Sequence, residues 1–328
     1  MFALESTPVV ALDQIRFIGS GLQRPECVLA TRSGDLYSAD WRGGVARTTA
    51  DGQSTLLSRA DLSGGRPLRP NGIAMRSNGN FLLADLGESL GGVYELDRAG
   101  QVAPILERVD GVDLPPTNFV HEDDQRRIWI TVSTSHRPRA AAYRADVADG
   151  YIVLLTNAGA RVVAEGIGYT NEALPSPDGK WLYVNETFGR KLSRFPLRED
   201  GELGAKEVVT TFGAGTFPDG LSFDQGGDMW ITSIVSNRVI RVKADGSQSL
   251  IVEDCDAAHL ERCEAAFQVG TMGRPHLDTC GGRLLRNISI LAFGGADRRT
   301  AYLGCLLGDA IAFFRAPVAG HAPVHWDR

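Results

Sequence analysis

The stretch GYTNEALPSPDGKWLYVNETFGRKLSRF, residues 168–195, decides the fold class of this chain. It holds three short runs of strand-forming residues, separated by the turn segments SPDG and ETFGR. This pattern predicts three antiparallel strands joined by tight turns. The first run nevertheless opens on Asn171 and Glu172, an amide and a carboxylate placed where the strand should become buried.

Similar units recur along the chain, each with a polar residue nine positions before the residue that opens its next strand. These polar residues are Glu26, Asn71, Asn118, Asn171 and Asp219, and consecutive members are 45, 47, 53 and 48 residues apart. A period of about 40–50 residues with three to four strands per unit is typical of a β-propeller. A sixth unit begins near NISILAFGG, residues 287–295.

The N-terminal run LDQIRFIG, residues 12–19, precedes the first unit, and we expect it to supply the outer strand of the last blade. Such closure removes the free sheet edge that an open ring would expose. The sequence therefore predicts an all-β, six-bladed β-propeller with four-stranded blades around a central channel, formed by residues 1–328 as a single domain.

The composition excludes several classes of function. Lys and Arg total 34 against 40 Asp and Glu, so the net charge of −6 argues against nucleic acid and anionic membrane surfaces as partners. No segment approaches the ~20 apolar residues of a membrane span. The N-terminus lacks a basic start and an apolar run, so we expect no signal peptide and a cytoplasmic protein. The five cysteines lack CxxC spacing, which predicts neither a disulfide framework nor a zinc site.

Two long connections should rim the face on which the polar residues lie. They are residues 133–150 and residues 253–286, and helical periodicity appears only within 255–270. Long loops inside a compact domain are usually functional or disordered. Arg137 and His276 on these loops are candidate substrate-binding residues, because a guanidinium fork suits a carboxylate or a hydroxyl cluster. The alternative is that Arg137 and His276 only face the solvent.

The innermost strands of a propeller surround its channel, so the five registered polar residues should converge on the axis. They offer carboxylate and amide oxygens without Cys or His, which suits a hard divalent cation. We expect one such ion, Ca²⁺ first, with Mg²⁺, Mn²⁺ or Zn²⁺ as alternatives. A polar channel that only holds water is the competing interpretation.

The motifs RPECVLA, RPNGIAM, TNFVHEDDQRRIWI, TNEALPSPDGKWLYVNET, FPDGLSFDQGGDMWITS and LAFGGADRRTAYLG occur in this order between residues 24 and 304. Together they resemble the SMP-30/gluconolactonase/LRE family of six-bladed propellers, with a more distant likeness to calcium-dependent phosphotriesterases. The resemblance implies a divalent metal held by Glu26, Asn118, Asn171 and Asp219. It also implies a lactonase, a carboxylic ester hydrolase in which Asp219 is both ligand and general base.

Two positions depart from that family's pattern. Family members commonly carry Asn-Gly where this chain has Asn171-Glu172, and a carboxylate near the position of Val120. Because side chains alternate along a strand, an axial Asn171 would turn Glu172 away from the channel. Three roles stay open for Glu172. It contacts the substrate, it contacts a metal ligand, or it is a buried carboxylate that needs a cation.

The leading hypothesis is hydrolysis of a sugar lactone or another small cyclic ester. A divalent ion would act as a Lewis acid on the carbonyl, and either Asp219 or a metal-activated water would supply the base. Asn71 is expected to bind the substrate or a metal-bound water, with turn capping as its alternative. Phosphotriester hydrolysis on the same metal and a non-catalytic ligand-binding propeller are the rival functions. The chain has no GxSxG motif, P-loop or dinucleotide fingerprint.

Overall fold

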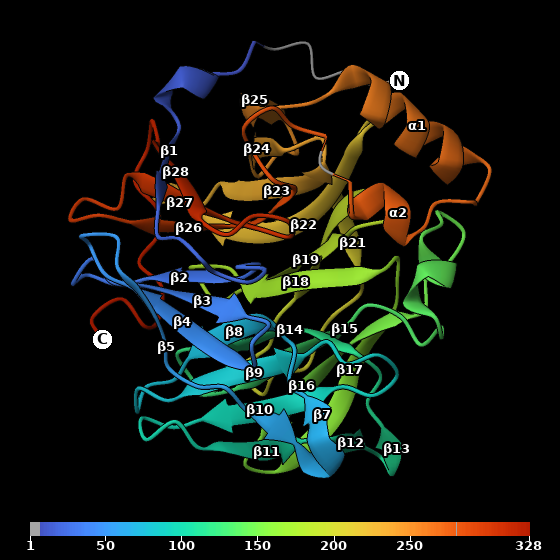
Figure 1. Ribbon diagram of the computed structural model, residues 1–328. Coiled ribbons are helices and arrows are strands. Elements are labelled where there is room, and N and C mark those ends of the chain that lie inside the picture. The colour runs from blue at the N-terminus through green and yellow to red at the C-terminus, as the bar shows by residue number, and fades with distance from the viewer. Residues whose placement is uncertain (1–6, 280) are drawn as a thin grey trace.

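The computed structural model describes residues 7–279 and 281–328, which form six four-stranded antiparallel sheets around a central axis (Figure 1). In five sheets the strands follow one another along the chain. The first strands of neighbouring sheets contact each other, which places them innermost. The predicted fold class is therefore confirmed.

The strands of these five blades are listed in chain order. Blade one contains β2 (Val28–Ala30), β3 (Leu36–Asp40), β4 (Gly44–Thr48) and β5 (Ser54–Leu56), and blade two contains β8 (Pro70–Met75), β9 (Phe81–Asp85), β10 (Gly92–Leu96) and β11 (Val102–Leu106). Blade three contains β14 (Thr117–Glu122), β15 (Ile128–Val132), β16 (Gly150–Thr156) and β17 (Gly159–Ile167). Blade four contains β18 (Thr170–Pro175), β19 (Trp181–Glu186), β20 (Lys191–Pro196) and β21 (Glu207–Thr211), and blade five contains β22 (Thr216–Phe223), β23 (Met229–Val235), β24 (Arg238–Val242) and β25 (Gln248–Glu253).

Blade six is assembled from both parts of the chain. Its strands are β26 (Ile288–Gly294), β27 (Thr300–Cys305), β28 (Ile311–Arg315) and, outermost, β1 (Arg16–Ile18). The antiparallel pairing of β1 with β28 sets Arg16 opposite Phe313 and Ile18 opposite Ile311. The N-terminal run thus closes the ring, as the sequence predicts.

Helices gather on one face of the propeller. Helix α1 (Ala257–Gln268) and the single turn α2 (Arg274–Leu277) interrupt the long connection between blades five and six, and the 3-10 turn η3 (Arg139–Ala142) lies in the long loop of blade three. All three lie on the right in Figure 1, and we call this face the mouth; the C-terminal end lies on the opposite, left side. The helix expected within residues 255–270 is confirmed. No helix of the described residues has the length and hydropathy needed to cross a membrane.

The remaining elements are peripheral. They are the 3-10 turns η1 (Leu12–Gln14) and η2 (Ser63–Gly65) and the two-stranded ladders β6 (Asp61–Leu62) with β7 (Arg66–Pro67) and β12 (Arg108–Val109) with β13 (Val112–Asp113). Cys27, Cys255, Cys263 and Cys305 are free thiols, and Cys280 lies outside the described residues.

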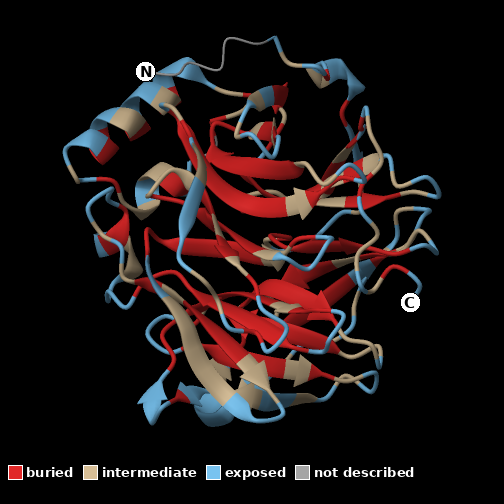
Figure 2. Cartoon of the chain, turned by 180° about the vertical axis from the view of Figure 1, so that it is seen from behind, coloured by how far each residue is buried: buried red, intermediate tan, exposed pale blue. Residues whose placement is uncertain are grey.

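The core lies between the blades, where the strands are buried almost throughout (Figure 2). Trp129 and Trp230 are among the largest fully buried side chains. Each donates its indole N–H to an aspartate in the turn between the first and second strands of its own blade, Asp123 at 2.9 Å and Asp224 at 3.0 Å. Satisfying this polar atom lets blades three and five bury a tryptophan at the same place.

Candidate metal and substrate site

Four of the five polar residues predicted from the spacing share one local distortion of the innermost strands, and Glu26 of blade one, just before β2, does not. In β8, β14, β18, β22 and β26 the pairing register with the next strand shifts at the same place, near the start of the strand. Asn71, Asn118, Asn171 and Asp219 each lie within such a shift and have no paired residue opposite them. A bulge of this kind re-aims a side chain, here toward the channel.

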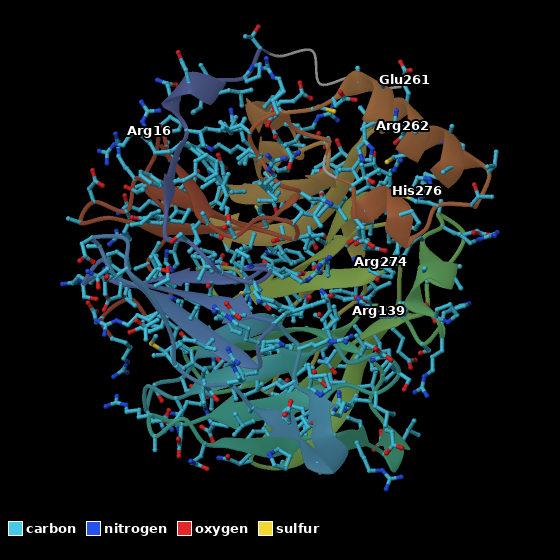
Figure 3. The ribbon with its side chains drawn as sticks, in the orientation of Figure 1. Arg16, Arg139, Glu261, Arg262, Arg274 and His276 are labelled. Carbon is cyan, nitrogen blue, oxygen red and sulfur yellow. The ribbon has the colours of Figure 1, made fainter. Side chains whose placement is uncertain are left out.

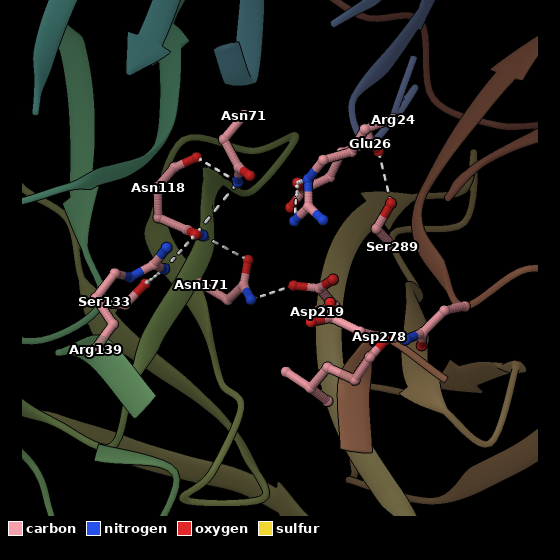
Figure 4. A network of polar contacts seen from close by, with 12 residues as sticks. Arg24, Glu26, Asn71, Asn118, Ser133, Arg139, Asn171, Asp219, Asp278 and Ser289 are labelled. Atoms are coloured by element: carbon pink, nitrogen blue, oxygen red, sulfur yellow. Dashed lines mark hydrogen bonds and ion pairs between the residues drawn. The ribbon is translucent and has the colours of Figure 1, made fainter. Parts of the chain in front are cut away.

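The amides and one carboxylate form a chain of hydrogen bonds around the channel (Figure 4). Asn71 donates from Nδ2 to the backbone oxygen of Asn118 at 3.0 Å. Asn118 Nδ2 donates to Asn171 Oδ1 at 2.8 Å, and Asn171 Nδ2 donates to Asp219 Oδ1. Glu26 of blade one is the fifth residue, and we call these five residues the polar group. Arg24 binds Glu26, with Nε 3.1 Å and Nη2 2.9 Å from Oε2.

A cavity of about 10 Å³ lies among these side chains, bordered by all five predicted residues and by Ser289. This volume is close to the minimum that accommodates one water or one ion. Asn71 Oδ1 is buried and has no hydrogen-bond partner among the described residues. Since a buried oxygen without a partner is costly, the cavity is suited to a bound cation or water.

The donor set fits a hard cation. Nowhere in residues 7–279 and 281–328 do three or more His, Cys, Asp or Glu side chains gather in a way that could hold an ion. The carboxylates of Glu26 and Asp219 therefore need the amide oxygens of Asn118 and Asn171 to complete an oxygen set. Ca²⁺ binds such mixed carboxylate and carbonyl oxygens readily.

The electrostatics point the same way. Burial, followed by the Glu26 carboxylate, raises the pKa of Asp219 well above its usual range, against the opposing influence of Arg24, Asn171 and Arg139. A divalent ion beside Asp219 would lower that pKa again by favouring the charged carboxylate. A cation bound here and the buried Asp219 carboxylate would therefore stabilise each other.

The sixth blade contributes a residue that the spacing did not reveal. Ser289 in β26 lies at the same register shift and donates from Oγ to the backbone oxygen of Glu26 at 2.7 Å. Strand β27 starts at Thr300, one position later relative to this polar residue than in the other blades. The regular spacing therefore points to Ile290 and misses Ser289.

Side chains of the second strands hold the bulges in place. Asn185 Nδ2 donates to the backbone oxygens of Asp219 and Gly220, both at 3.0 Å, and Thr232 Oγ1 accepts the Gly220 N–H at 2.9 Å. A Cβ on Gly220 would lie 2.4 Å from the backbone oxygen of Ser289, so only glycine fits there. Sequence reasoning missed both Asn185 and Thr232.

An aromatic cluster covers the mouth face beside the polar group. Tyr143 stacks on Phe188 with ring centroids 4.5 Å apart, and Phe188 contacts Phe217 edge-on at 5.8 Å. Phe267 of α1 packs against Phe217 at 5.3 Å. These contacts anchor the long connection between blades five and six over the blade-four and blade-five side of the mouth.

Among the described residues, the two loop residues predicted to bind substrate make no hydrogen bond or ion pair with the polar group. Arg137 is exposed and precedes the cis-proline Pro138. His276 accepts the N–H of Gly273 at Nδ1, 3.1 Å away, inside the α2 turn. Arg139, two residues beyond Arg137, is the loop residue that reaches the polar group, with Nη2 3.4 Å from Asn118 Oδ1. Figure 3 places Arg139, Arg274 and His276 on the mouth face.

Comparison with known proteins identifies the family. The SMP-30/Gluconolactonase/LRE-like region model matches residues 25–254, which include Glu26, Asn71, Asn118, Asn171 and Asp219. The chain belongs to the SMP-30/gluconolactonase/LRE-like family. The resemblance inferred from the motifs is confirmed.

Individual proteins are similar over most of the chain. A 6-deoxy-6-sulfogluconolactonase of Pseudomonas putida is 31% identical over 236 residues, which cover 70% of this chain and 67% of that protein. A gluconolactonase from Xanthomonas campestris superposes with a TM-score of 0.68 at 18% identity, covering 92% and 89% of the two chains. The calcium-binding protein regucalcin from Agrobacterium tumefaciens gives 0.62 at 18% identity, covering 92% and 96%. At these identities the two structures show the shared fold alone.

In this member of the SMP-30/gluconolactonase/LRE-like family, Glu172 occupies the second position of the blade-four bulge. The bulge keeps it on the channel, so the alternation expected from a regular strand does not apply. Glu172 borders both the small cavity and a cavity of about 470 Å³ on the opposite side. Burial, with the charges of Asp219 and Glu26, raises the pKa of Glu172 well above its usual range.

The larger cavity opens away from the mouth. Apolar side chains of the inner strands line it, together with His121 of blade three and His325 near the C-terminal end. Burial lowers the pKa of both imidazoles to about 4, so they are neutral at pH 7. Cys27, Phe119 and Glu172 separate this cavity from the polar group, because all three border both spaces.

Proposed function

We propose that the protein is a divalent-metal-dependent lactonase that opens a sugar lactone or another small cyclic ester. The observation that carries this proposal is a set of four side chains with oxygen donors that border one small cavity: Asn118, Asn171 and Asp219, which lie in the bulges of their strands, and Glu26 of blade one. A channel that only held water would need neither two buried carboxylates nor their alignment with two amides.

When bound, a divalent ion would polarise the lactone carbonyl and stabilise the negative charge that develops on its oxygen. Asp219 is assigned the base. Its Oδ1 accepts from Asn171, so the other oxygen, Oδ2, takes the proton from the attacking water. That proton then passes to the ring oxygen of the lactone as the ester bond breaks, which leaves a hydroxy acid.

The relatives support this assignment. The names of the Pseudomonas putida and Xanthomonas campestris proteins describe lactone hydrolysis, and the name of the Agrobacterium tumefaciens protein describes calcium binding. We extend both properties to this chain, with Ca²⁺ as the first ion to test. Asn71 borders the same cavity and is assigned to a substrate hydroxyl or to a water on the ion.

The test is hydrolysis of a panel of lactones by protein that has been stripped with a chelator and reloaded with Ca²⁺, Mg²⁺, Mn²⁺ or Zn²⁺. We expect turnover of at least one lactone, its loss on chelation and its return with one of the ions. A phosphotriester in the same panel identifies the rival hydrolase. Binding of a lactone without turnover under any ion would instead identify a ligand-binding propeller.

A further inference from the structure

We infer that the substrate carries a negatively charged group, a carboxylate or a sulfonate attached to the lactone, and that Arg139 binds it. The inference rests on the proposed function, because it names the substrate class of the same site. It also replaces Arg137 by Arg139 as the loop residue that meets the substrate.

Arg139 has unused hydrogen-bonding capacity beside the site. Its Nη2 makes long contacts with Asn118 Oδ1 at 3.4 Å and Ser133 Oγ at 3.3 Å. Its Nε is buried and finds no partner within the described part of the chain. The other arginine at the polar group, Arg24, is by contrast paired with Glu26. Arg139 is therefore a partly buried cation beside a proposed metal ligand and without a strong partner.

Packing holds the Arg139 guanidinium in place. Its Cζ lies 5.6 Å from the ring centroid of Tyr169, within cation–π distance, and Tyr169 contacts Tyr143 and Phe188 edge-on. A planar cation oriented in this way loses little conformational entropy when it binds, and it can offer two parallel N–H groups to an anion.

The charges of the site also favour an anion. Arg24 and Arg139 both act electrostatically on Asp219. With a divalent ion bound, two guanidiniums and the ion outweigh the carboxylates of Glu26, Asp219 and Glu172 even when all three are charged, so the site is positive overall. A neutral lactone would cover Arg139 without compensating its charge, which is costly, whereas an anionic lactone would pair with it. Uncharged lactones should therefore be poorer substrates.

The experiment compares three lactones of the same ring: one uncharged, one with a distal carboxylate and one with a distal sulfonate. We expect the metal-loaded wild type to show higher kcat/KM for an anionic lactone than for the uncharged one. Comparing kcat/KM for the two anionic lactones shows whether a carboxylate or a sulfonate is preferred. Arg139→Gln should lower kcat/KM for the anionic lactone by about 10- to 100-fold, mainly through KM, and change the uncharged one less than about 3-fold.

Two further variants make the result specific. Arg139→Lys keeps the charge without the planar fork and should recover part of the loss. Arg144→Gln is the matched control, because Arg144 lies on the same loop, is exposed, and pairs with Asp146 at 2.8 Å. It should keep the wild-type ratio between the lactones. Melting temperatures identify any variant that fails to fold.

The outcomes separate the two proposals. If Arg139→Gln lowers the rates of charged and uncharged lactones equally, or if the wild type prefers the uncharged lactone, the charge inference is overturned and lactone hydrolysis stands. If no lactone is opened, the proposed function fails, and calorimetric binding of the intact anionic lactone to wild type and Arg139→Gln decides the inference. If the anionic lactone binds the wild type but not Arg139→Gln, the charge inference is supported. If the anionic lactone does not bind the wild type, the charge inference is overturned.

Discussion

The carboxylate of Glu172 accepts the backbone N–H of Leu221, with 2.8 Å between Oε2 and the nitrogen. The bond joins the inner strands of blades four and five just below the polar group. Leu221 N lies directly after the blade-five bulge, so the bond satisfies a backbone donor next to Asp219. Glu172 thus stabilises the strand that carries the proposed base.

Replacing Glu172 tests this role. Because its raised pKa favours the neutral acid, Glu172→Gln should leave the free energy of unfolding within about 1 kcal/mol of wild type. Glu172→Ala should cost about 1–3 kcal/mol, since it leaves the Leu221 N–H buried without a partner. Urea unfolding of both variants measures the difference. Equal destabilisation by Gln and Ala would contradict the assignment, and lost turnover in a stable Gln variant would indicate a substrate contact.

Asp219→Asn should remove turnover while sparing the fold. Loss of a general base lowers kcat by about 10²- to 10⁴-fold, and the isosteric amide keeps the side chain's size. The control is Asp228→Asn in the same blade, whose carboxylate pairs with Arg241 at 2.8 Å on the far face. Full activity in Asp219→Asn would rule out Asp219 as the base and would favour a metal-activated water.

Ca²⁺ should raise the melting temperature of the stripped protein. A ligand at 100 times its Kd stabilises the state that it binds by about 2.7 kcal/mol. Asn171→Ala and Glu26→Ala should abolish this increase, whereas Asn78→Ala, in an exposed turn of blade two, should keep it. An unchanged calcium effect in Glu26→Ala would place the ion elsewhere.

The contribution of His121 and His325 to stability should fall between about pH 6.5 and pH 4. The pKa of His121 and of His325 is lowered to about 4 in the folded chain, mainly by burial, so the unfolded chain binds more protons throughout this window. Stability from the neutral imidazoles is present above the unfolded pKa and is lost as the pH falls toward the folded pKa. His325→Asn should flatten the fall by an amount on the order of 3 kcal/mol or less. A wild-type slope in this variant would refute the contribution.

Arg190 should hold helix α1 on the mouth. Its Cζ lies 4.4 Å from the ring centroid of Phe217 and 4.1 Å from that of Phe267, and its guanidinium pairs with Glu264 of α1. Arg190→Ala should speed limited proteolysis within residues 254–286. Arg262→Ala, on the exposed side of α1, is the control. Equal cleavage rates in the two variants would show that the aromatic contacts suffice without Arg190.

The repeat made the fold predictable. Turn signals such as SPDG and the regular spacing of Asn118, Asn171 and Asp219 are local features, and they recur from blade to blade. Closure by β1 was also predictable, because a propeller without it would leave an unpaired edge. These features depend on short-range chemistry that a single sequence displays.

The parts that escaped prediction depend on irregular geometry. Strand alternation predicts that Glu172 points away from the channel, but Glu172 lies in a bulge and borders the small cavity in the channel. A bulge has no reliable signal in one sequence. Ser289 was hidden by one extra residue in its unit. The path of a long loop follows no repeat, so nothing in the sequence says whether Arg137 or Arg139 turns toward Asn118.

The bond between Ser289 and Glu26 links residues 263 positions apart, and β1 and β28 meet across a similar span. Contacts of such long range are slow to form during folding, because the intervening chain must first be brought together. During synthesis β1 therefore has no partner until the last blade has been made. The polar group comes from blades one to five, but Ser289 of blade six bonds the backbone of Glu26 only when the ring closes, so binding competence should appear in one late step.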